Sequence, residues 1–550
     1  MPPMSDDTVA AAEAHRQQTR RTRRLLHAMT AVALLITAAV GTAAMADTPP
    51  DPHPSTADQE QGMHPGRPFH DPADADTAGS QDLNITLGAA DTRFEVGGRK
   101  VYGQSYNGSF VAPTIRMTPG STVTIKLVNH LSVATNLHFH GLHVSPEGQS
   151  DDPFLCVAPG AETTYQLAIP ANHPQGTFWY HSHAMGKTCP PPGSTDGMDG
   201  MDGMSDTPDP SATPSAPSSP GTGFTPGDVM NQVFAGLSGA IIVGDDRTLL
   251  PRDLRYTTTH TMVLKDVQLD STGHIVQGFI NSKAPTVRLV NGQLRPVLTM
   301  KPNETQLWRL VNAGANISYQ LQLDGYQFTV VGEDGVPVNQ VSTPDRLLLP
   351  PGKRYDVLVT ASDHPGTATL RNVAFNTGPI GDNYPDVPLA TIKVAGHPVP
   401  KKSTVSGSIP TAPADLSAVP VAQHRTVDFT QSSDNMSYYI NGKQFAMDSP
   451  AFDTPAKVGT VEEWTIVNHT GVDHPFHLHT NAFQVVSVNG VPQPYTARDD
   501  TVPVPHEVNG VPGQIVIRVD FADFPGKWMF HCHIAAHEDF GMMSYINVVP

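Results

Sequence analysis

Fourteen residues recur three times along this chain of 550 residues, and this repeat limits the possible folds more than any other feature. The copies span 116–129, 299–312 and 455–468, and each is a turn followed by an alternating strand that ends in Val-Asn. An Asn-Gly pair, which is typical of tight hairpin turns, precedes every copy. A strand-rich unit repeated at such wide intervals predicts three related β-sandwich domains.

A second landmark follows each copy of the repeat. A Pro-Gly pair introduces an alternating strand, and a further turn leads to a short strand at 176–183, 366–372 and 526–533. The content of glycine and proline (46 and 52 residues) and the low share of charged residues (16%) agree with many turns between short strands. The sequence therefore predicts the all-β fold class.

The repeat and the composition between its copies divide the chain into three domains, at 82–246, 247–397 and 421–550. A run at 398–420, rich in Pro, Ser and Thr, is expected to link the last two domains. Residues 47–81 have little apolar content and are expected to form a flexible leader. An insert at 190–226, rich in Pro, Ser, Gly and Met, interrupts the first domain and is expected to form no packed core.

Residues 1–46 have the features of an export signal. Four arginines lie between Arg20 and Arg24, an apolar stretch at 31–40 follows, and Ala44-Met45-Ala46 fits a cleavage site. The apolar stretch is too short to span a bilayer. The Arg-Arg pair at 23–24 resembles a twin-arginine signal, with an ordinary secretory signal as the alternative. We expect an exported protein, secreted or in the periplasm or cell envelope, without a stable membrane anchor.

Charge and cysteine usage narrow the class of protein. The formal net charge of -18 argues against a nucleic-acid-binding surface, which is usually basic. There are three cysteines. If Cys532 holds a metal, Cys156 and Cys189 are free to pair as a disulfide in an oxidising compartment, and two separate thiols are the alternative.

Histidines occupy one fixed register in the two outer domains. Nine and eleven residues after the Val-Asn landmark stand His138 and His140 in the first domain, His477 and His479 in the third, and Leu321 and Leu323 in the middle domain. A single H-x-H motif is weak evidence for a metal site, but agreement of register between two repeats is strong evidence. We therefore expect metal chemistry in the outer domains, with the middle domain as a spacer.

The short strand after the second landmark also ends in paired histidines in the outer domains only. The pairs are His181 and His183 in the first domain, and His531 and His533 in the third. Residues two apart in a strand share a face, so Cys532 points away from its two neighbours. A thiolate, imidazoles and a weak thioether are the ligands of a blue-copper electron-transfer site. The tripeptide at 531–533 therefore predicts two metal sites that it joins.

These motifs resemble, over about residues 82–550, the three-domain multicopper oxidases, the family of laccases, bilirubin oxidases and bacterial cuprous oxidases. The resemblance implies three cupredoxin-like Greek-key β-sandwich domains and four copper ions. It assigns the type 1 copper to His474, Cys532, His537 and axial Met542. It assigns the type 2 copper to His138 and His477. It assigns the type 3 pair to His140, His181, His183, His479, His531 and His533. For Met542, core packing beside Met543 is the alternative.

The resemblance also implies a reaction. An exported oxidase of laccase type takes electrons one at a time from phenols or aromatic amines, passes them through Cys532, and reduces O2 to water. Glu538 stands where similar bacterial enzymes relay protons, with a solvated surface carboxylate as the alternative. Asp151 resembles the acid near the type 2 copper, although Asp152 or a turn-capping role is also open. Asp500 is expected to support ligands from behind or to have a structural role.

Other functions compete with this interpretation. Met198, Met201 and Met204 in the insert offer soft ligands to Cu(I), which suits a cuprous oxidase for copper tolerance, although an inert linker explains them equally. A copper-sequestering protein without turnover is a further alternative. Nitrite reductases are disfavoured because they lack a full type 3 ligand set. By analogy with the family, three domains in one chain suggest a monomer.

Overall fold

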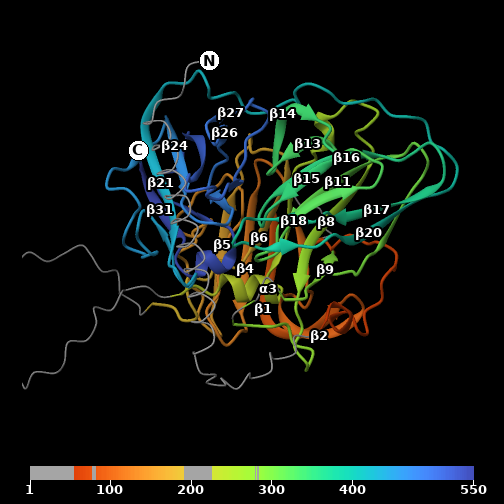
Figure 1. The fold of residues 1–550 in the computed structure, drawn as a ribbon, viewed down its shortest axis with the longest axis horizontal. Helices are drawn as coiled ribbons and strands as arrows, with labels where there is room; N and C mark the ends of the chain where they lie inside the picture. The colour runs from red at the N-terminus through yellow and green to blue at the C-terminus, as the bar shows by residue number, and fades with distance from the viewer. Residues whose placement is uncertain (1–54, 77–81, 191–225, 279, 281–283) are drawn as a thin grey trace, which may run out of the picture. The chain divides into compact units, whose positions relative to one another are not determined.

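The computed structural model describes residues 55–76, 82–190, 226–278, 280 and 284–550 (Figure 1). The export signal predicted over 1–46 and nearly all of the insert at 190–226 lie outside the described residues. In the described part, strands form three pairs of sheets, one pair for each predicted domain. The predicted all-β class, with three related sandwiches, is confirmed.

The first domain pairs a four-stranded sheet with a three-stranded sheet. The larger sheet has the order β2-β1-β4-β5 and contains β1 (Leu83–Val96), β2 (Arg99–Tyr106), β4 (Thr122–Asn129) and β5 (Glu162–Ala168). The smaller has the order β3-β7-β6 and contains β3 (Ala112–Met117), β6 (Gly176–His181) and β7 (Ser238–Val243).

The middle domain pairs a six-stranded sheet with a five-stranded sheet. The order β14-β13-β16-β11-β8-β9 contains β8 (Thr258–Val267), β9 (Val287–Val290), β11 (Thr305–Asn312), β13 (Thr329–Glu333), β14 (Val336–Ser342) and β16 (Arg354–Thr360). The order β10-β20-β17-β12-β15 contains β10 (Val297–Met300), β12 (Tyr319–Leu323), β15 (Arg346–Leu349), β17 (Gly366–Asn372) and β20 (Val387–Val394). A separate hairpin joins β18 (Phe375–Asn376) and β19 (Asn383–Tyr384).

The third domain has sheets of the same sizes. The order β22-β21-β24-β29-β26-β27 contains β21 (Val421–Gln431), β22 (Tyr438–Ile440), β24 (Thr460–Asn468), β26 (Gln484–Val488), β27 (Val491–Pro492) and β29 (Gly513–Phe521). The order β23-β31-β30-β25-β28 contains β23 (Ala456–Lys457), β25 (His474–Leu478), β28 (Thr501–Val504), β30 (Gly526–Cys532) and β31 (Met543–Val549).

The repeated strand has the same neighbours in every domain. β4, β11 and β24 each lie between a parallel partner (β1, β8 or β21) and an antiparallel partner (β5, β16 or β29). Its alternating apolar side chains face a core enclosed by the two sheets of the same domain.

The asparagine that ends each repeat explains why the motif recurs. Asn129, Asn312 and Asn468 are fully buried. Each side-chain oxygen accepts a hydrogen bond from the N–H two residues later, and each side-chain amide donates to carbonyls of two separate segments, one of them four or five residues on. Each of these hydrogen bonds contributes about 1 kcal/mol net to stability. The asparagine therefore fixes the segments around the end of the strand in all three domains.

The loop after this asparagine is one residue longer in the middle domain. Asn312 donates to the carbonyl of Ile317, five residues on, whereas Asn468 donates to that of Val472, four residues on. A one-residue shift moves every following side chain to the other face of a strand. Leu321 and Leu323 accordingly lie in the middle core, so their expected equivalence with the histidines is wrong by one residue.

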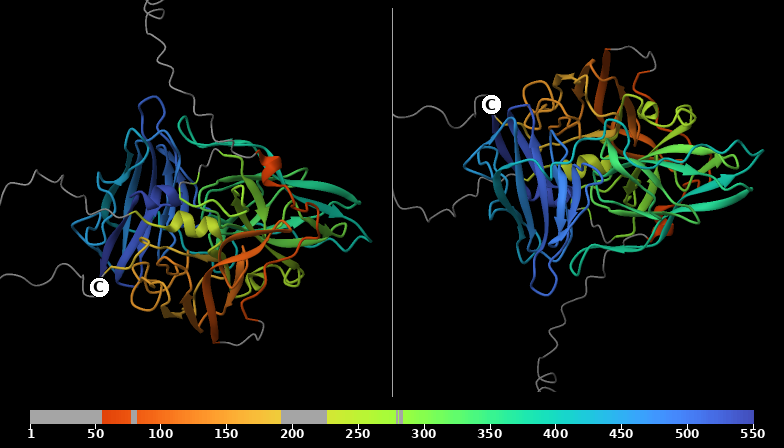
Figure 2. Two further views of the ribbon diagram at one scale, coloured as in Figure 1. Left: turned by 90° about the horizontal axis from the view of Figure 1, so that it is seen from below. Right: turned by 90° about the horizontal axis from the view of Figure 1, so that it is seen from above.

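Four short helices complete the described residues, namely α2 (Thr56–Gln59), α3 (Val229–Ala235), α4 (Ala535–Asp539) and the 3-10 helix η1 (Asp246–Leu249). α3 is buried along its whole length and lies where the three groups of strands meet (Figure 2). Asp539 accepts hydrogen bonds from the backbone N–H groups of Val229 (2.9 Å) and Met230 (2.8 Å). This carboxylate satisfies the free donors at the start of α3 and so ties α3 to α4.

The leader differs from its prediction. Residues 55–76 were expected to be part of a flexible leader at 47–81, but they pack on the domains. Gln59 exchanges two hydrogen bonds with the backbone of Leu269 (2.7 and 3.0 Å). An ion pair to the middle domain and backbone bridges to the first and middle domains hold the segment further. Its partners lie far away in sequence, so its polar composition alone did not reveal them.

The linker at 398–420 also lies against a domain. Gln484 and Arg518 of the third domain hydrogen-bond to Leu416 and Ser417.

No helix in the described ranges is long and apolar enough to cross a membrane.

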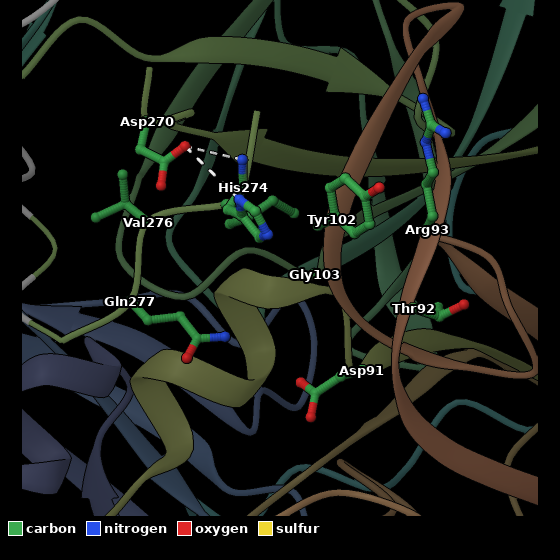
Figure 3. Close-up of a pocket in the computed structure, with 10 residues that line it drawn as sticks. Asp91, Thr92, Arg93, Tyr102, Gly103, Asp270, His274, Val276 and Gln277 are labelled. Carbon is green, nitrogen blue, oxygen red and sulfur yellow. Dashed lines mark hydrogen bonds and ion pairs between the residues drawn. The ribbon is translucent and has the colours of Figure 1, made fainter. Parts of the chain in front are cut away.

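A hollow of about 650 Å³ marks one contact between the first and middle domains (Figure 3). Tyr102 exchanges backbone hydrogen bonds with Gly273 and Ile275 (3.0 and 2.8 Å). Its ring stacks on His274 with 4.6 Å between centroids, and the guanidinium carbon of Arg93 lies 5.5 Å from the centre of the ring (Figure 3). This stack fastens the β1–β2 ribbon to the middle domain.

Candidate metal centres

The first candidate centre is built within the third domain. Neighbouring strands bring together His474, at the start of β25, and Cys532, at the end of β30, and α4 adds His537. The Sγ atom of Cys532 lies 3.4 Å from Nδ1 of His474 and 3.6 Å from Nδ1 of His537. The two imidazole nitrogens are 3.1 Å apart. The side-chain atoms of three residues predicted to form the type 1 site thus lie close together.

The repeat asparagine orients one ring of this centre. Thr470 donates its hydroxyl hydrogen to Oδ1 of Asn468 (2.8 Å), and its oxygen lies 2.8 Å from Nε2 of His474. The oxygen is therefore the acceptor for the Nε2–H group, which leaves the lone pair of Nδ1 directed at Cys532. Such a partner fixes the tautomer of a metal-binding histidine.

The thiol and the thioether of this centre are fully buried. Cys532 is a free cysteine, and burial raises the pKa of its thiol. A buried thiolate needs a cation beside it, which a bound metal ion provides. Met542 is also fully buried, and its backbone closes the loop by accepting from the N–H of Cys532 (3.1 Å) and donating to His537 (2.9 Å). These residues fit a copper ion.

The second candidate centre is formed by the eight histidines of the four H-x-H motifs. Strand pairing places them two by two. In the first domain His138 and His181 exchange backbone hydrogen bonds (2.9 and 3.1 Å), and in the third domain His477 lies opposite His531. Both outer domains thus present their histidines in the same paired arrangement.

Rings from the two outer domains stack on each other. His140 lies on His477 with 3.8 Å between centroids, and His138 lies on His479 with 3.9 Å. Ring nitrogens within 4.8 Å of one another form three groups, namely His138, His140 and His477; His140, His181 and His533; and His183, His479 and His531. All eight predicted histidines therefore meet at one interface between the outer domains.

The chemistry of these rings fits a metal cluster. None of the eight is more than 3% exposed. Six carry a buried ring nitrogen without a hydrogen-bond partner, namely His138, His181, His183, His477, His479 and His533. Burial lowers the pKa of His181 to about 3 and that of His183 to about 4, so these rings are neutral. Buried, unpartnered nitrogen lone pairs are costly unless a ligand binds them, and copper accepts imidazole readily.

Asp151, not Asp152, faces the cluster. Oδ1 of Asp151 lies 3.0 Å from Nδ1 of His138 and accepts from the N–H of Phe139 (2.9 Å). Burial raises the pKa of Asp151 to about 7. Asp152 instead accepts from the N–H of Phe154 in a local turn. The turn-capping alternative thus applies to the second acid of the pair.

Glu538 is buried, which excludes a solvated surface carboxylate. It is 1% exposed, and its oxygens lie 3.2 Å from Nε2 of His183 and 3.2 Å from Nδ1 of His531. Burial alone would raise its pKa, but the two imidazoles bring it to about 2. The carboxylate stands between rings from both outer domains.

Two supports of the cluster were not predicted. Gln232 of α3 accepts hydrogen bonds from the hydroxyls of Ser182 (2.6 Å) and Thr135 (2.7 Å), and so holds the His-Ser-His turn of the first domain. Asp500 was expected to have a supporting role, but its partner Arg354 in the middle domain was not foreseen. The middle domain is therefore more than a spacer. No local pattern marks these side chains, because their partners are distant in sequence.

The remaining predicted pair is a disulfide. Cys156 and Cys189 are bonded to each other, as the sequence predicts. The bond joins the loop after Asp151 to the segment that follows β6, the strand that carries His181.

Comparisons with known proteins agree with this geometry. Multicopper oxidase family profiles match residues 89–202, 253–390 and 417–550. The multicopper oxidase mco of Staphylococcus haemolyticus is 29% identical over 470 residues, which cover 80% of this chain and 83% of that protein. The laccase of Bacillus subtilis is 25% identical over 517 residues, with coverage of 80% and 89%.

A solved structure shares the fold. The multicopper oxidase of Campylobacter jejuni, described as a metallo-oxidase, superimposes with a TM-score of 0.69 at 23% identity; the match covers 89% of this chain and 97% of that one. The three family matches and the shared fold lead to one conclusion. The chain belongs to the multicopper oxidase family, whose members are copper-dependent oxidoreductases.

Proposed function

We propose that this protein is a four-copper oxidase of laccase type. It takes single electrons from phenols or aromatic amines and reduces O2 to water. One observation carries the proposal, namely that Cys532 belongs to the first centre while its covalent neighbours His531 and His533 belong to the second. Three consecutive residues thus join a donor site to an oxygen site. When bound, copper supplies the one-electron redox steps and the binding of O2.

The ligand assignment follows the three nitrogen groups and the thiolate centre. His474, Cys532, His537 and Met542 would hold the type 1 copper. His138 and His477 would hold the type 2 copper. His140, His181 and His533 would hold one type 3 copper, and His183, His479 and His531 the other. The grouping of ring nitrogens within 4.8 Å supports the two type 3 sets and the closeness of His138 to His477, and it places His140 between the two sites.

His537 is the proposed entry point for electrons. It is half-buried, whereas His474 and Cys532 beside it are buried. The ring of Tyr438 stacks on it with 4.2 Å between centroids. A small aromatic donor would therefore approach the exposed edge of His537 and the neighbouring Tyr438.

Two acids have separate proposed roles in proton management. Asp151 accepts the Nδ1–H of His138 and so keeps the other ring nitrogen, Nε2, available as a ligand atom. Glu538, in contact with His183 and His531, is placed to accept protons and relay them toward the cluster.

We also propose an exported monomer. The disulfide between Cys156 and Cys189 supports an oxidising compartment, and the arginine-bearing segment at 1–46 supports export. Amino-terminal sequencing of secreted and periplasmic fractions tests this, since a mature protein that still begins before residue 40 would contradict removal of the signal.

Copper-loaded protein tests the activity. We expect four coppers per chain, an intense blue thiolate absorption, and oxygen uptake with a phenolic dye. Bound copper without oxygen uptake would contradict the oxidase and favour a copper-sequestering protein. Turnover on Cu(I) with almost none on phenols would show that the electron donor is Cu(I) and not a phenol or aromatic amine. A variant lacking residues 191–225 then shows whether Met198, Met201 and Met204 matter, because an inert linker predicts unchanged Cu(I) and phenol rates.

A further inference from the structure

A loop of the middle domain touches the histidine cluster. In this loop Gly352 has a φ of +89°, and a Cβ added there would lie 2.8 Å from Cδ2 of His533 and 3.0 Å from Cε1 of His140. Only glycine permits this approach, because any side chain would press on both rings. The middle domain therefore closes the cluster on the side of these two histidines.

The same loop ends in a buried cation. Arg354 is fully buried and donates two parallel hydrogen bonds, each 2.7 Å long, to the two carboxylate oxygens of Asp500. It also donates to the carbonyls of Gly352 (3.0 Å) and Thr177 (3.2 Å). A bidentate arginine–carboxylate pair fixes the plane of the carboxylate as well as its position.

The carboxylate of Asp500 in turn contacts a ligand ring. Its Oδ1 lies 3.1 Å from Nε2 of His140, while Nδ1 of His140 lies 3.1 Å from Nε2 of His533 inside the cluster. Asp500 therefore accepts the Nε2–H of His140, which leaves the Nδ1 lone pair directed at the metal position. A chain of contacts thus leads from Arg354 through Asp500 to His140.

Another acid, from the middle domain, holds the backbone of the first two members of this chain. Asp334, at the turn between β13 and β14, accepts hydrogen bonds from the backbone N–H groups of Arg354 and Asp500 (3.0 Å each). It accepts a further one from the N–H of Thr501 (3.2 Å), whose hydroxyl donates to Asp500 (2.8 Å). The carboxylate that meets His140 is thus held by Arg354 and Thr501, and the backbone that carries it is held by Asp334.

We propose that Arg354 is a positioning residue of the cluster, which orients Asp500 so that His140 presents Nδ1 to its copper. The middle domain then supplies no ligand but determines the geometry of one. This inference rests on the proposed four-copper oxidase. The competing explanation is that Arg354 only joins the domains, as any buried ion pair at an interface does.

Arg309 provides the matched control. It is also a buried arginine of the middle domain, its guanidinium pairs with Asp246 and Asp356, and it donates to Thr177 of the first domain. In the described residues its hydrogen bonds and ion pairs reach no histidine of the cluster. Loss of either arginine breaks a buried ion pair near the same interface, but only one supports His140.

The test compares the copper spectra of Arg354→Gln, Arg354→Lys and Arg309→Gln. We expect Arg354→Gln to bind cluster copper about 10- to 100-fold more weakly. The type 2 electron paramagnetic resonance signal should also change, because the backbone oxygen of Asp500 lies 2.8 Å from Nδ1 of His477, a proposed type 2 ligand. The blue absorption at Cys532 should persist. Arg354→Lys should restore part of the occupancy, and Arg309→Gln should keep all signals. Wild-type copper content and signals in Arg354→Gln, or an equal change in Arg309→Gln, would overturn the proposal.

A second variant covers the case in which Arg354→Gln does not fold. Gly352→Ala adds a methyl group against His533 and His140, whereas Gly160→Ala has the same type of positive φ (+76°) at the equivalent turn with nothing within 4 Å. Only Gly352→Ala should lower cluster occupancy beyond the shared backbone strain, and equal spectra would count against the proposal. Wild-type protein without a blue band or four coppers would instead refute the proposed function itself.

Discussion

The third and middle domains have the same strand pairing around very different surfaces. In the third domain β25 pairs with β30, so that Phe476 lies opposite Cys532 and His477 opposite His531. In the middle domain β12 pairs with β17, so that Leu321 lies opposite Asn372 and Gln322 opposite Arg371. The two domains share the backbone pairing, and the metal-binding residues of the third domain stand at positions where the middle domain has other residues.

The two domains differ most at the strand positions whose side chains point away from the domain's own core. His477 and His531 are fully buried against the first domain. The counterpart of His531, Arg371, is partly exposed and pairs with Asp324 (2.6 Å) and Asp386 (2.9 Å). A cluster therefore forms only where two such faces meet and bury each other. The middle domain contributes through its loop ends instead, above all through Arg354.

Substitution of the paired residue Cys532 should have the largest effect. Cys532→Ser removes the thiolate ligand, so we expect loss of the blue absorption and of essentially all oxidase activity. The counterpart Asn372→Ser should cost about 1–2 kcal/mol, because Asn372 makes two hydrogen bonds, and should leave activity intact. Phenol turnover by Cys532→Ser would contradict the proposed electron route.

Removal of copper should have the next largest effect, and it should destabilise the third domain more than the middle domain. Ligand binding at a thousandfold excess over Kd stabilises a fold by about 4 kcal/mol. Hydrogen exchange should therefore speed up strongly in β25 and β30 of the apoprotein, and little in β12 and β17. Equal acceleration in all four strands would mean that the middle domain depends on the metal as much as the outer ones do.

A smaller contrast concerns the repeated asparagine. Asn468→Ala and Asn312→Ala each remove three or more buried hydrogen bonds, so both should lower the free energy of unfolding by about 2–3 kcal/mol. Only Asn468→Ala should also shift the blue absorption, because Asn468 holds Thr470 and through it His474. Denaturant unfolding and the visible spectrum measure the two effects.

The smallest effect is expected at Arg371. Arg371→Ala removes ion pairs that are partly exposed to solvent, which contribute about 0–1 kcal/mol. Copper content and oxygen uptake should match those of the wild type. A clear loss of activity would show that this face of the middle domain has a role that its exposure does not suggest.

Much of the fold and of the candidate site follows from local sequence. Strand alternation puts His531 and His533 on one face and Cys532 on the other, so their spacing predicts two joined centres. The repeated turn and alternating strand that end in the repeat asparagine predict three sandwiches, because both patterns are local. Counting residues from the asparagine gave the wrong equivalence for Leu321 in the middle domain. The loop there has one extra residue, so the following side chains point to the opposite faces of the strand.

The sequence by itself determined the three sandwiches, the paired histidines and the family resemblance, because alternation and turn chemistry act over a few residues. Only the tertiary structure decided that Asp151 faces the cluster and that residues 55–76 are docked on the domains. It alone also joined Arg354 to Asp500, which are 146 positions apart. Such contacts depend on how separate domains pack, and no local period in the chain encodes that packing.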